Sequence, residues 1–281
     1  MSSEHQSFKH QSLEEIEIQL LLEGIYRYYG YDFRNYAPSS LKRRIIGFLN
    51  TENLSSISAL QDRVLHDREC LVRLTRSLTV NVTSMFRDPS FYIAFRKCVI
   101  PILRTYPFIR IWHAGCSTGE EVYSMAILLQ EEGLYDRCRL YGTDANESVL
   151  HIARGGVYPL RFMRGYTQLY LNSGGQRSFS EYYTAAYEEA ILRSSLKRNM
   201  VFAQHNLVTD GSFNEFNVIC CRNVLIYFDR TLQRRVHDLF YNSLCSFGVL
   251  GLGRQESVKF TQYSAHYNEL SPLEKIYRKI S

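Results

Sequence analysis

The stretch HAGCSTGEEVYSMA, residues 113–126, places two glycines between an apolar run and an amphipathic segment. The preceding run FIRIW, residues 108–112, is typical of a buried strand, and the segment after the turn is typical of a helix. A glycine turn between a strand and a helix often holds a ligand against the free N–H groups of the helix start. The identity of that ligand is the main question that the sequence raises.

Short apolar runs alternate with helical segments from residue 108 onward. This alternation predicts a parallel sheet covered by helices on both faces. Ligands of such sheets bind at the carboxyl ends of the strands, which is where the glycine turn falls. Further strands are expected in RLYGTDA (139–145), NMVFAQHNL (199–207), FNVICCRNVLIYF (216–228) and GVLGLG (248–253).

The first part of the chain has a different pattern. Apolar residues at helical spacing, such as Ile18, Leu21 and Ile25, predict a helix that Gly30 ends. A second helix is expected over residues 37–50, with Ser39 or Ser40 as its cap. We therefore predict a helical domain over residues 1–77, followed by an α/β domain over 78–281.

Composition narrows the class of protein. The 281 residues are 45% hydrophobic, and no apolar run approaches the ~18 residues of a membrane span. The polar start is unlike a secretory signal, and seven cysteines without a CxxC pair favour a reducing compartment and no metal site. A net charge of +5 does not indicate nucleic acid. We expect a cytoplasmic protein.

The residues of the glycine turn favour one kind of ligand. Gly115 and Gly119 fit neither the phosphate loop, which needs a lysine, nor the GxGxxG pattern of dinucleotide sites. The carboxylates of Glu120 and Glu121 would repel a pyrophosphate but suit an amine or a sulfonium. Asp144, at a strand end, could bind two ribose hydroxyls. S-adenosylmethionine meets these demands, although adjacent glutamates in a first helical turn can also simply complement the helix dipole.

Several blocks occur together in an order that resembles the chemotaxis receptor methyltransferase family, CheR. The resemblance spans roughly residues 13–279 and implies a small N-terminal helical domain followed by a Rossmann-like methyltransferase domain. It also implies a small antiparallel β subdomain at about 165–200 that contacts receptors. The blocks are LTVNVTSMFRDP (78–89), WHAGCSTGEEVYSMA (112–126), YGTDANESVLHIARGGVY (141–158), HNL (205–207), CRNVLIYF (221–228) and IYRK (276–279).

The resemblance implies S-adenosylmethionine-dependent methyl esterification of glutamate side chains on chemoreceptor cytoplasmic helices, by a monomer. Tyr227 is expected near the transferred methyl group, and Arg87 near the carboxylate of the cofactor. Glu121 would bind the amine and Asp144 the ribose. The implied cofactor-binding residues are Asn81, Thr83, Arg87, Ala114, Gly115, Glu121, Asp144, Asn206, Leu207, Arg222 and Asn223, and the implied catalytic residues are Tyr227 and Arg87.

The chain departs from the family pattern at some positions. Asn217 stands where the family has Asp, and GRQES (253–257) replaces the usual GxSE. Two alternatives therefore stay open. One is a relative that binds the cofactor as a scaffold or sensor without turnover. The other is a methyltransferase of the same fold that acts on a small molecule or a nucleic acid.

Overall fold

The computed structural model describes residues 12–78, 83–259 and 261–280 of the chain. These residues form two compact units. The first holds the described residues up to Leu78 together with Tyr227–Asp229, and the second holds the rest. Within the described residues, none of the helices combines the length and the apolar character needed to cross a membrane.

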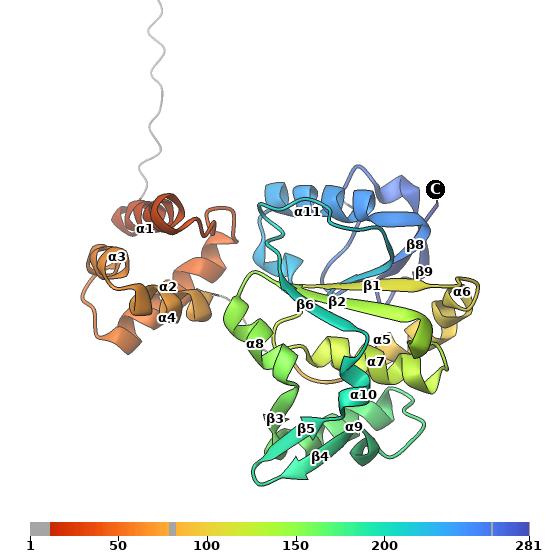
Figure 1. The fold of residues 1–281 in the computed structure, drawn as a ribbon. Helices are drawn as coiled ribbons and strands as arrows, with labels where there is room; N and C mark the ends of the chain where they lie inside the picture. The colour runs from red at the N-terminus through yellow and green to blue at the C-terminus, as the bar shows by residue number, and fades with distance from the viewer. Residues whose placement is uncertain (1–11, 79–82, 260, 281) are drawn as a thin grey trace, which may run out of the picture. The chain divides into compact units, whose positions relative to one another are not determined.

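The described residues of the first unit form the helices α1 to α4 (Figure 1). The first helix starts with a capping box, in which Ser12 accepts from the Glu15 N–H, and ends at Gly30 with φ +79°. The second helix begins at Pro38 without a side-chain cap, so the expectation of Ser39 or Ser40 as cap was wrong. The helices are α1 Leu13–Tyr29, α2 Pro38–Glu52, α3 Ile57–His66 and α4 Arg68–Leu78.

The short segment Tyr227–Asp229 belongs to this first unit. The backbone carbonyl of Tyr227 accepts a hydrogen bond of 2.8 Å from the Ala37 N–H, and the Asp229 N–H donates to Asn35 across 2.9 Å. The Arg44 guanidinium lies 4.7 Å from the centre of the Tyr227 ring. The tyrosine expected beside the transferred methyl group is thus held by residues around the start of α2.

The second unit contains a seven-stranded sheet in the order β6-β2-β1-β7-β8-β10-β9. The first five strands run parallel, β10 is antiparallel to β8, and β9 is antiparallel to β10. The carboxyl ends of β6, β2, β1 and β7 therefore meet at one edge. The strands are β1 Ile109–Ala114, β2 Cys138–Asp144, β6 Met200–Gln204, β7 Phe216–Cys221, β8 Leu244–Leu252, β9 Tyr267–Ser271 and β10 Ile276–Lys279.

Helices cover both faces of this sheet, with α11 on one face and α5 and α7 on the other (Figure 1). The apolar residues of α7 from Val122 to Leu129 are buried, which explains the long hydrophobic run after the glycine turn. The helices are α5 Pro89–Cys98, α6 Ile100–Leu103, α7 Glu120–Glu131, α8 Glu147–Gly155, α9 Met163–Asn172, α10 Ser194–Lys197 and α11 Arg230–Ser243.

A separate three-stranded antiparallel sheet follows α8, in the order β3-β5-β4. Its strands are β3 Val157–Pro159, β4 Tyr183–Ala186 and β5 Glu189–Leu192. The buried carboxylate of Glu131 anchors this part to α7, because it accepts from the Tyr182 hydroxyl at 2.9 Å. The predicted fold class is confirmed, including the small antiparallel sheet. The strand expected over residues 216–228 ends at Cys221, where the chain turns away from the sheet.

Candidate cofactor site

The glycine turn after β1 is fastened to the end of β2. The N–H groups of Gly115 and Cys116 both donate to the Thr143 carbonyl at 2.8 Å. Gly115 has φ +73°, and a Cβ there would lie 2.6 Å from a methyl group of Val224. Only glycine tolerates this conformation and this approach without strain. The turn therefore brings the ends of β1, β2 and β7 together.

Asp144 lies at the carboxyl end of β2, beside the turn. One carboxylate oxygen accepts the Ser117 N–H at 2.9 Å, and the other accepts the Asn146 N–H at 3.0 Å. Burial raises the pKa of Asp144 in spite of these bonds. The buried Ser117 hydroxyl and Asn146 amide nitrogen have no hydrogen-bond partner among the residues that the structure describes. These unused polar atoms flank the carboxylate and fit the hydroxyls of a ribose.

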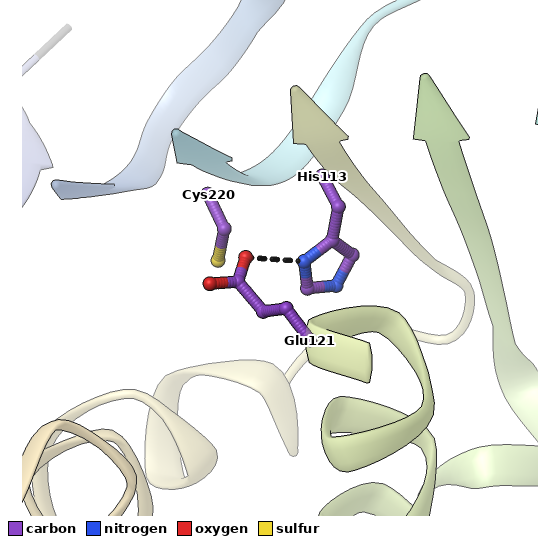
Figure 2. A group of neighbouring side chains, drawn as sticks. All are labelled: His113, Glu121 and Cys220. Carbon is purple, nitrogen blue, oxygen red and sulfur yellow. Dashed lines mark hydrogen bonds and ion pairs between the residues drawn. The ribbon is translucent and has the colours of Figure 1, made fainter. Parts of the chain in front are cut away.

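Glu121, in the first turn of α7, is held from two sides. His113 of β1 donates from Nδ1 to one carboxylate oxygen at 2.9 Å, as Figure 2 shows. Arg222 donates to the other oxygen at 3.0 Å. Burial alone would raise the pKa of Glu121, but the hydrogen bond from His113 and the charge of Arg222 outweigh it, so this pKa is lowered. Glu121 is therefore a fixed, ionised carboxylate that suits a ligand amine.

Glu120 differs from its neighbour, although both were expected to face a cation. It is buried and bonds to the Thr118 hydroxyl at 2.7 Å and the Tyr166 hydroxyl at 3.4 Å. Burial raises the pKa of Glu120. Since Tyr166 belongs to α9, Glu120 links the glycine turn to the part of the chain that carries the small sheet, and only Glu121 meets Arg222.

Arg222 follows β7 and connects three segments. Its guanidinium also donates to the Asp88 carboxylate at 2.9 Å and to the Arg87 carbonyl at 3.0 Å. It lies 4.0 Å from the centre of the Phe91 ring, and its side chain is 2% exposed. Phe86 and Asp88, on either side of Arg87, both have φ +54°, a conformation that is unfavourable for such residues. Arg222 thus supports the strained segment from which Arg87 extends.

His113, Glu121 and Cys220 form a compact group whose donor atoms lie within 4.8 Å of one another. Figure 2 shows the Cys220 thiol next to the carboxylate, with the imidazole on the other side. Such residues can bind a metal ion. Here, however, both carboxylate oxygens already accept hydrogen bonds from His113 and Arg222, and burial raises the pKa of the Cys220 thiol well above its usual value. The chemistry of the group therefore favours a hydrogen-bonded support for Glu121 over a metal centre.

Four of the remaining predicted residues stand at or just after the carboxyl ends of strands: Ala114, Asn206, Leu207 and Asn223. Asn81 lies outside the described residues. Tyr227 belongs to the first unit. Ala114 ends β1, while Asn206 and Leu207 follow β6 and Asn223 follows β7, and the half-buried Thr83 and Arg87 precede α5.

Sequence reasoning missed three residues around this site. His113 was assigned no role, and Ser117 and Asn146 were not considered. The sequence did place His113 at the end of an apolar run and Ser117 within the glycine turn. The partners of these residues, however, depend on which strands are neighbours in the sheet. Asn217, which stands where the family has Asp, lies in β7, and its side-chain oxygen accepts the Arg110 N–H at 2.8 Å.

Comparison with known families matches both units of the chain. Residues 81–271 match the family model described as CheR methyltransferase, SAM binding domain. Residues 16–79 match the model described as CheR methyltransferase, all-alpha domain. The chain belongs to the CheR methyltransferase family. S-adenosylmethionine is its cofactor, and the fixed Glu121 and the polar atoms around Asp144 fit the amine and the ribose of that molecule.

Among curated proteins, the chain is similar to Cher3 of Pseudomonas putida strain KT2440, with 52% identity over 265 residues that cover 94% of this chain and 97% of the relative. It is 30% identical to the chemotaxis protein methyltransferase of Listeria monocytogenes, over 82% of this chain and 85% of that protein. It is 31% identical to chemotaxis protein methyltransferase 1 of Vibrio cholerae, over 78% of this chain and 80% of that protein. The similarity therefore extends over most of each CheR relative.

Proposed function

We propose that this CheR protein transfers the methyl group of S-adenosylmethionine to glutamate side chains on the cytoplasmic helices of a chemoreceptor. The observation that carries the proposal is that a CheR methyltransferase domain contains both a fixed, ionised Glu121 and a buried Asp144 flanked by unpartnered polar atoms. Relatives named chemotaxis protein methyltransferase support the receptor as substrate. Because these receptor helices lie in the cytoplasm, we expect the protein to act there.

The chemistry of the site suits a carboxylate acceptor. A glutamate is already ionised at pH 7, so methyl transfer needs positioning and partial desolvation and no general base. Accordingly, His113 is committed to Glu121, and burial keeps the pKa of the Cys116 and Cys220 thiols well above the usual value. When bound, S-adenosylmethionine would supply the methyl group: its S–CH3 bond would break with the electron pair kept by sulfur, while a carboxylate oxygen of the acceptor provides the pair for the new O–CH3 bond and S-adenosylhomocysteine is the leaving thioether.

The roles of individual residues follow from the same proposal. Glu121 binds the cofactor amine, and Asp144 binds the ribose. Arg87 meets the cofactor carboxylate, and Tyr227 orients the acceptor. Of the other implied contacts, Asn206 and Leu207 flank the adenine, while Arg222 and Asn223 line the floor. The guanidinium of Arg222 is occupied by Glu121 and Asp88, so its contribution is support for the residues around it.

The small antiparallel sheet is the part that we expect to contact the receptor. Its β4–β5 turn carries Tyr187, whose side chain is fully exposed at 100%. Exposed aromatic side chains are frequent in protein interfaces. Replacing Tyr187 with Ser should weaken receptor methylation and leave cofactor affinity unchanged.

The test of the reaction uses labelled S-adenosylmethionine and the cytoplasmic fragment of a chemoreceptor from the same cell. The label should appear on glutamate as an ester, which mild alkali cleaves to release volatile methanol. Label that resists alkali would favour a different acceptor. Absence of label with several receptors, in a protein that still binds the cofactor, would favour the scaffold without turnover.

A further inference from the structure

The loop after β7 is held by the carboxylate of Glu256, which is 4% exposed. One oxygen accepts the N–H of Gly253 at 2.6 Å and that of Asn223 at 3.0 Å. The other accepts the N–H of Val224 at 2.8 Å and that of Ile226 at 3.4 Å. The N–H groups of three loop residues, Asn223, Val224 and Ile226, thus depend on a side chain that comes from the segment after β8.

The local backbone is shaped for this carboxylate. Asn223 has φ +60°, so successive N–H groups point inward and form a concave anion site. A Cβ at Gly253 would lie 2.6 Å from the Glu256 oxygen and 2.8 Å from the Asn223 nitrogen. A glycine is therefore required where the two segments meet. Here the anion that fills the concave site is part of the chain itself.

The same loop borders the cofactor site on two sides. Val224 closes against Gly115 of the glycine turn, where even a methyl group would clash. Arg222, at the start of the loop, reaches Glu121. A shift of the loop would therefore displace the turn, the arginine and the glutamate together.

We propose that Glu256 is a positioning residue of the cofactor site: its carboxylate fixes the loop from Arg222 to Ile226 in the shape that binds S-adenosylmethionine. The inference uses the cofactor of the family and does not depend on the identity of the methyl acceptor. A purely structural role would be met by any group that fills the space. A role in positioning requires the two carboxylate oxygens, because four N–H donors depend on them.

The change Glu256→Gln keeps the size of the side chain and replaces one oxygen with an NH₂ group. Whichever oxygen is replaced, two backbone N–H groups lose their acceptor. The matched control is Glu274→Gln. Glu274 is 7% exposed and accepts from Arg254 at 2.7 Å, a bond that does not involve the loop and that the substitution weakens.

The experiment measures the dissociation constant of S-adenosylhomocysteine by calorimetry, amide hydrogen exchange over residues 222–226, and the thermal midpoint of each variant. Glu256→Gln should weaken binding by at least about tenfold, the effect of one buried group left without its partner. Exchange over the loop should be faster. In the methylation assay, KM for S-adenosylmethionine should rise more than kcat falls. Glu274→Gln should lower the thermal midpoint without these effects.

Two outcomes would overturn the inference. One is a folded Glu256→Gln protein with wild-type affinity and wild-type exchange over the loop. The other is an equal loss of affinity in both variants, which would make Glu256 an ordinary structural residue. A wild-type chain that binds no S-adenosylhomocysteine would overturn the cofactor assignment as well. If the wild-type chain binds S-adenosylhomocysteine but does not methylate the receptor, only the proposed acceptor is wrong, and the binding measurements still test the role of Glu256. If Glu256→Gln does not fold, Glu256→Asp, with its shorter reach, takes its place in the same measurements.

Discussion

The Arg222 guanidinium donates to the Glu121 carboxylate across 3.0 Å, although the two residues are 101 positions apart in the chain. Arg222 comes from the loop after β7 and Glu121 from the first turn of α7. The pair is largely buried, and it is extended by His113 on one side and by Asp88 on the other. A fixed carboxylate in this position needs no reorganisation when a cationic amine binds.

Removing the arginine should leave two carboxylates without their partner. Arg222→Met is expected to lower the free energy of unfolding by about 3–5 kcal/mol, because the largely buried Glu121 would keep only His113 as a partner and the partly exposed Asp88 would lose its cation. Chemical denaturation measures this. The control Arg27→Met breaks a pair with Glu23 in which the side chains are 78% and 36% exposed, and it should cost less than about 1 kcal/mol. Equal losses in the two variants would contradict the role of Arg222 as a buried support.

Asp144 should be essential for cofactor affinity. Asp144→Asn retains one acceptor oxygen and loses the charge, so binding of S-adenosylhomocysteine should weaken by at least about tenfold in calorimetry. The surface change Asp136→Asn, on a carboxylate that pairs with Arg198, should have no effect. Unchanged affinity in a folded Asp144→Asn protein would mean that the ribose binds elsewhere.

Tyr227 should matter for turnover more than for binding. Tyr227→Phe removes only the hydroxyl, and the hydrogen bond from Ala37 to the backbone carbonyl remains. The turnover rate should fall while the affinity for S-adenosylhomocysteine stays close to that of the wild type, because the lost interaction is made with the acceptor during transfer. The matched change Tyr241→Phe, on a tyrosine stacked on Tyr263, should leave the rate unchanged. Equal rates for Tyr and Phe at position 227 would reduce that residue to a packing role.

His237 of α11 should make stability depend on pH. Its side chain is buried, and burial lowers its pKa from 6.5 to about 4. Between pH 6.5 and 4, His237 binds a proton in the unfolded chain but not in the folded chain. The contribution of the neutral, buried His237 to stability is therefore complete above pH 6.5 and is lost as the pH falls toward 4. The loss from this one residue is about 1.4 kcal/mol per pH unit.

Denaturation curves at several pH values check this expectation. His237→Leu should flatten the pH dependence of the free energy of unfolding between pH 6.5 and 4. His66→Leu, on a side chain that is 77% exposed, should leave it unchanged. If the slope persists in His237→Leu, another group is responsible for it.

Local patterns in the sequence were enough for the fold class and for the general place of the site. The period of the apolar residues predicted the helices of the first unit and the alternating strands and helices of the second. The glycine turn at 115–119 and the strand end at Asp144 indicated the edge where we expect the ligand, since parallel strands place their carboxyl ends together. These features depend on residues close in sequence, so they can be read without the structure.

The tertiary structure alone decided how the site is held. The sequence treats Glu120 and Glu121 as equivalent, but burial and the nearest charge separate them: one has a raised pKa and contacts Tyr166, and the other has a lowered pKa and pairs with Arg222. The GRQES stretch reads as a departure from the family, yet its Glu256 holds the loop after β7. The physical reason is the same in each case. Hydrogen bonds and charge pairs in a buried site are set by which distant segments the sheet order brings together, and no local period in the sequence encodes that order.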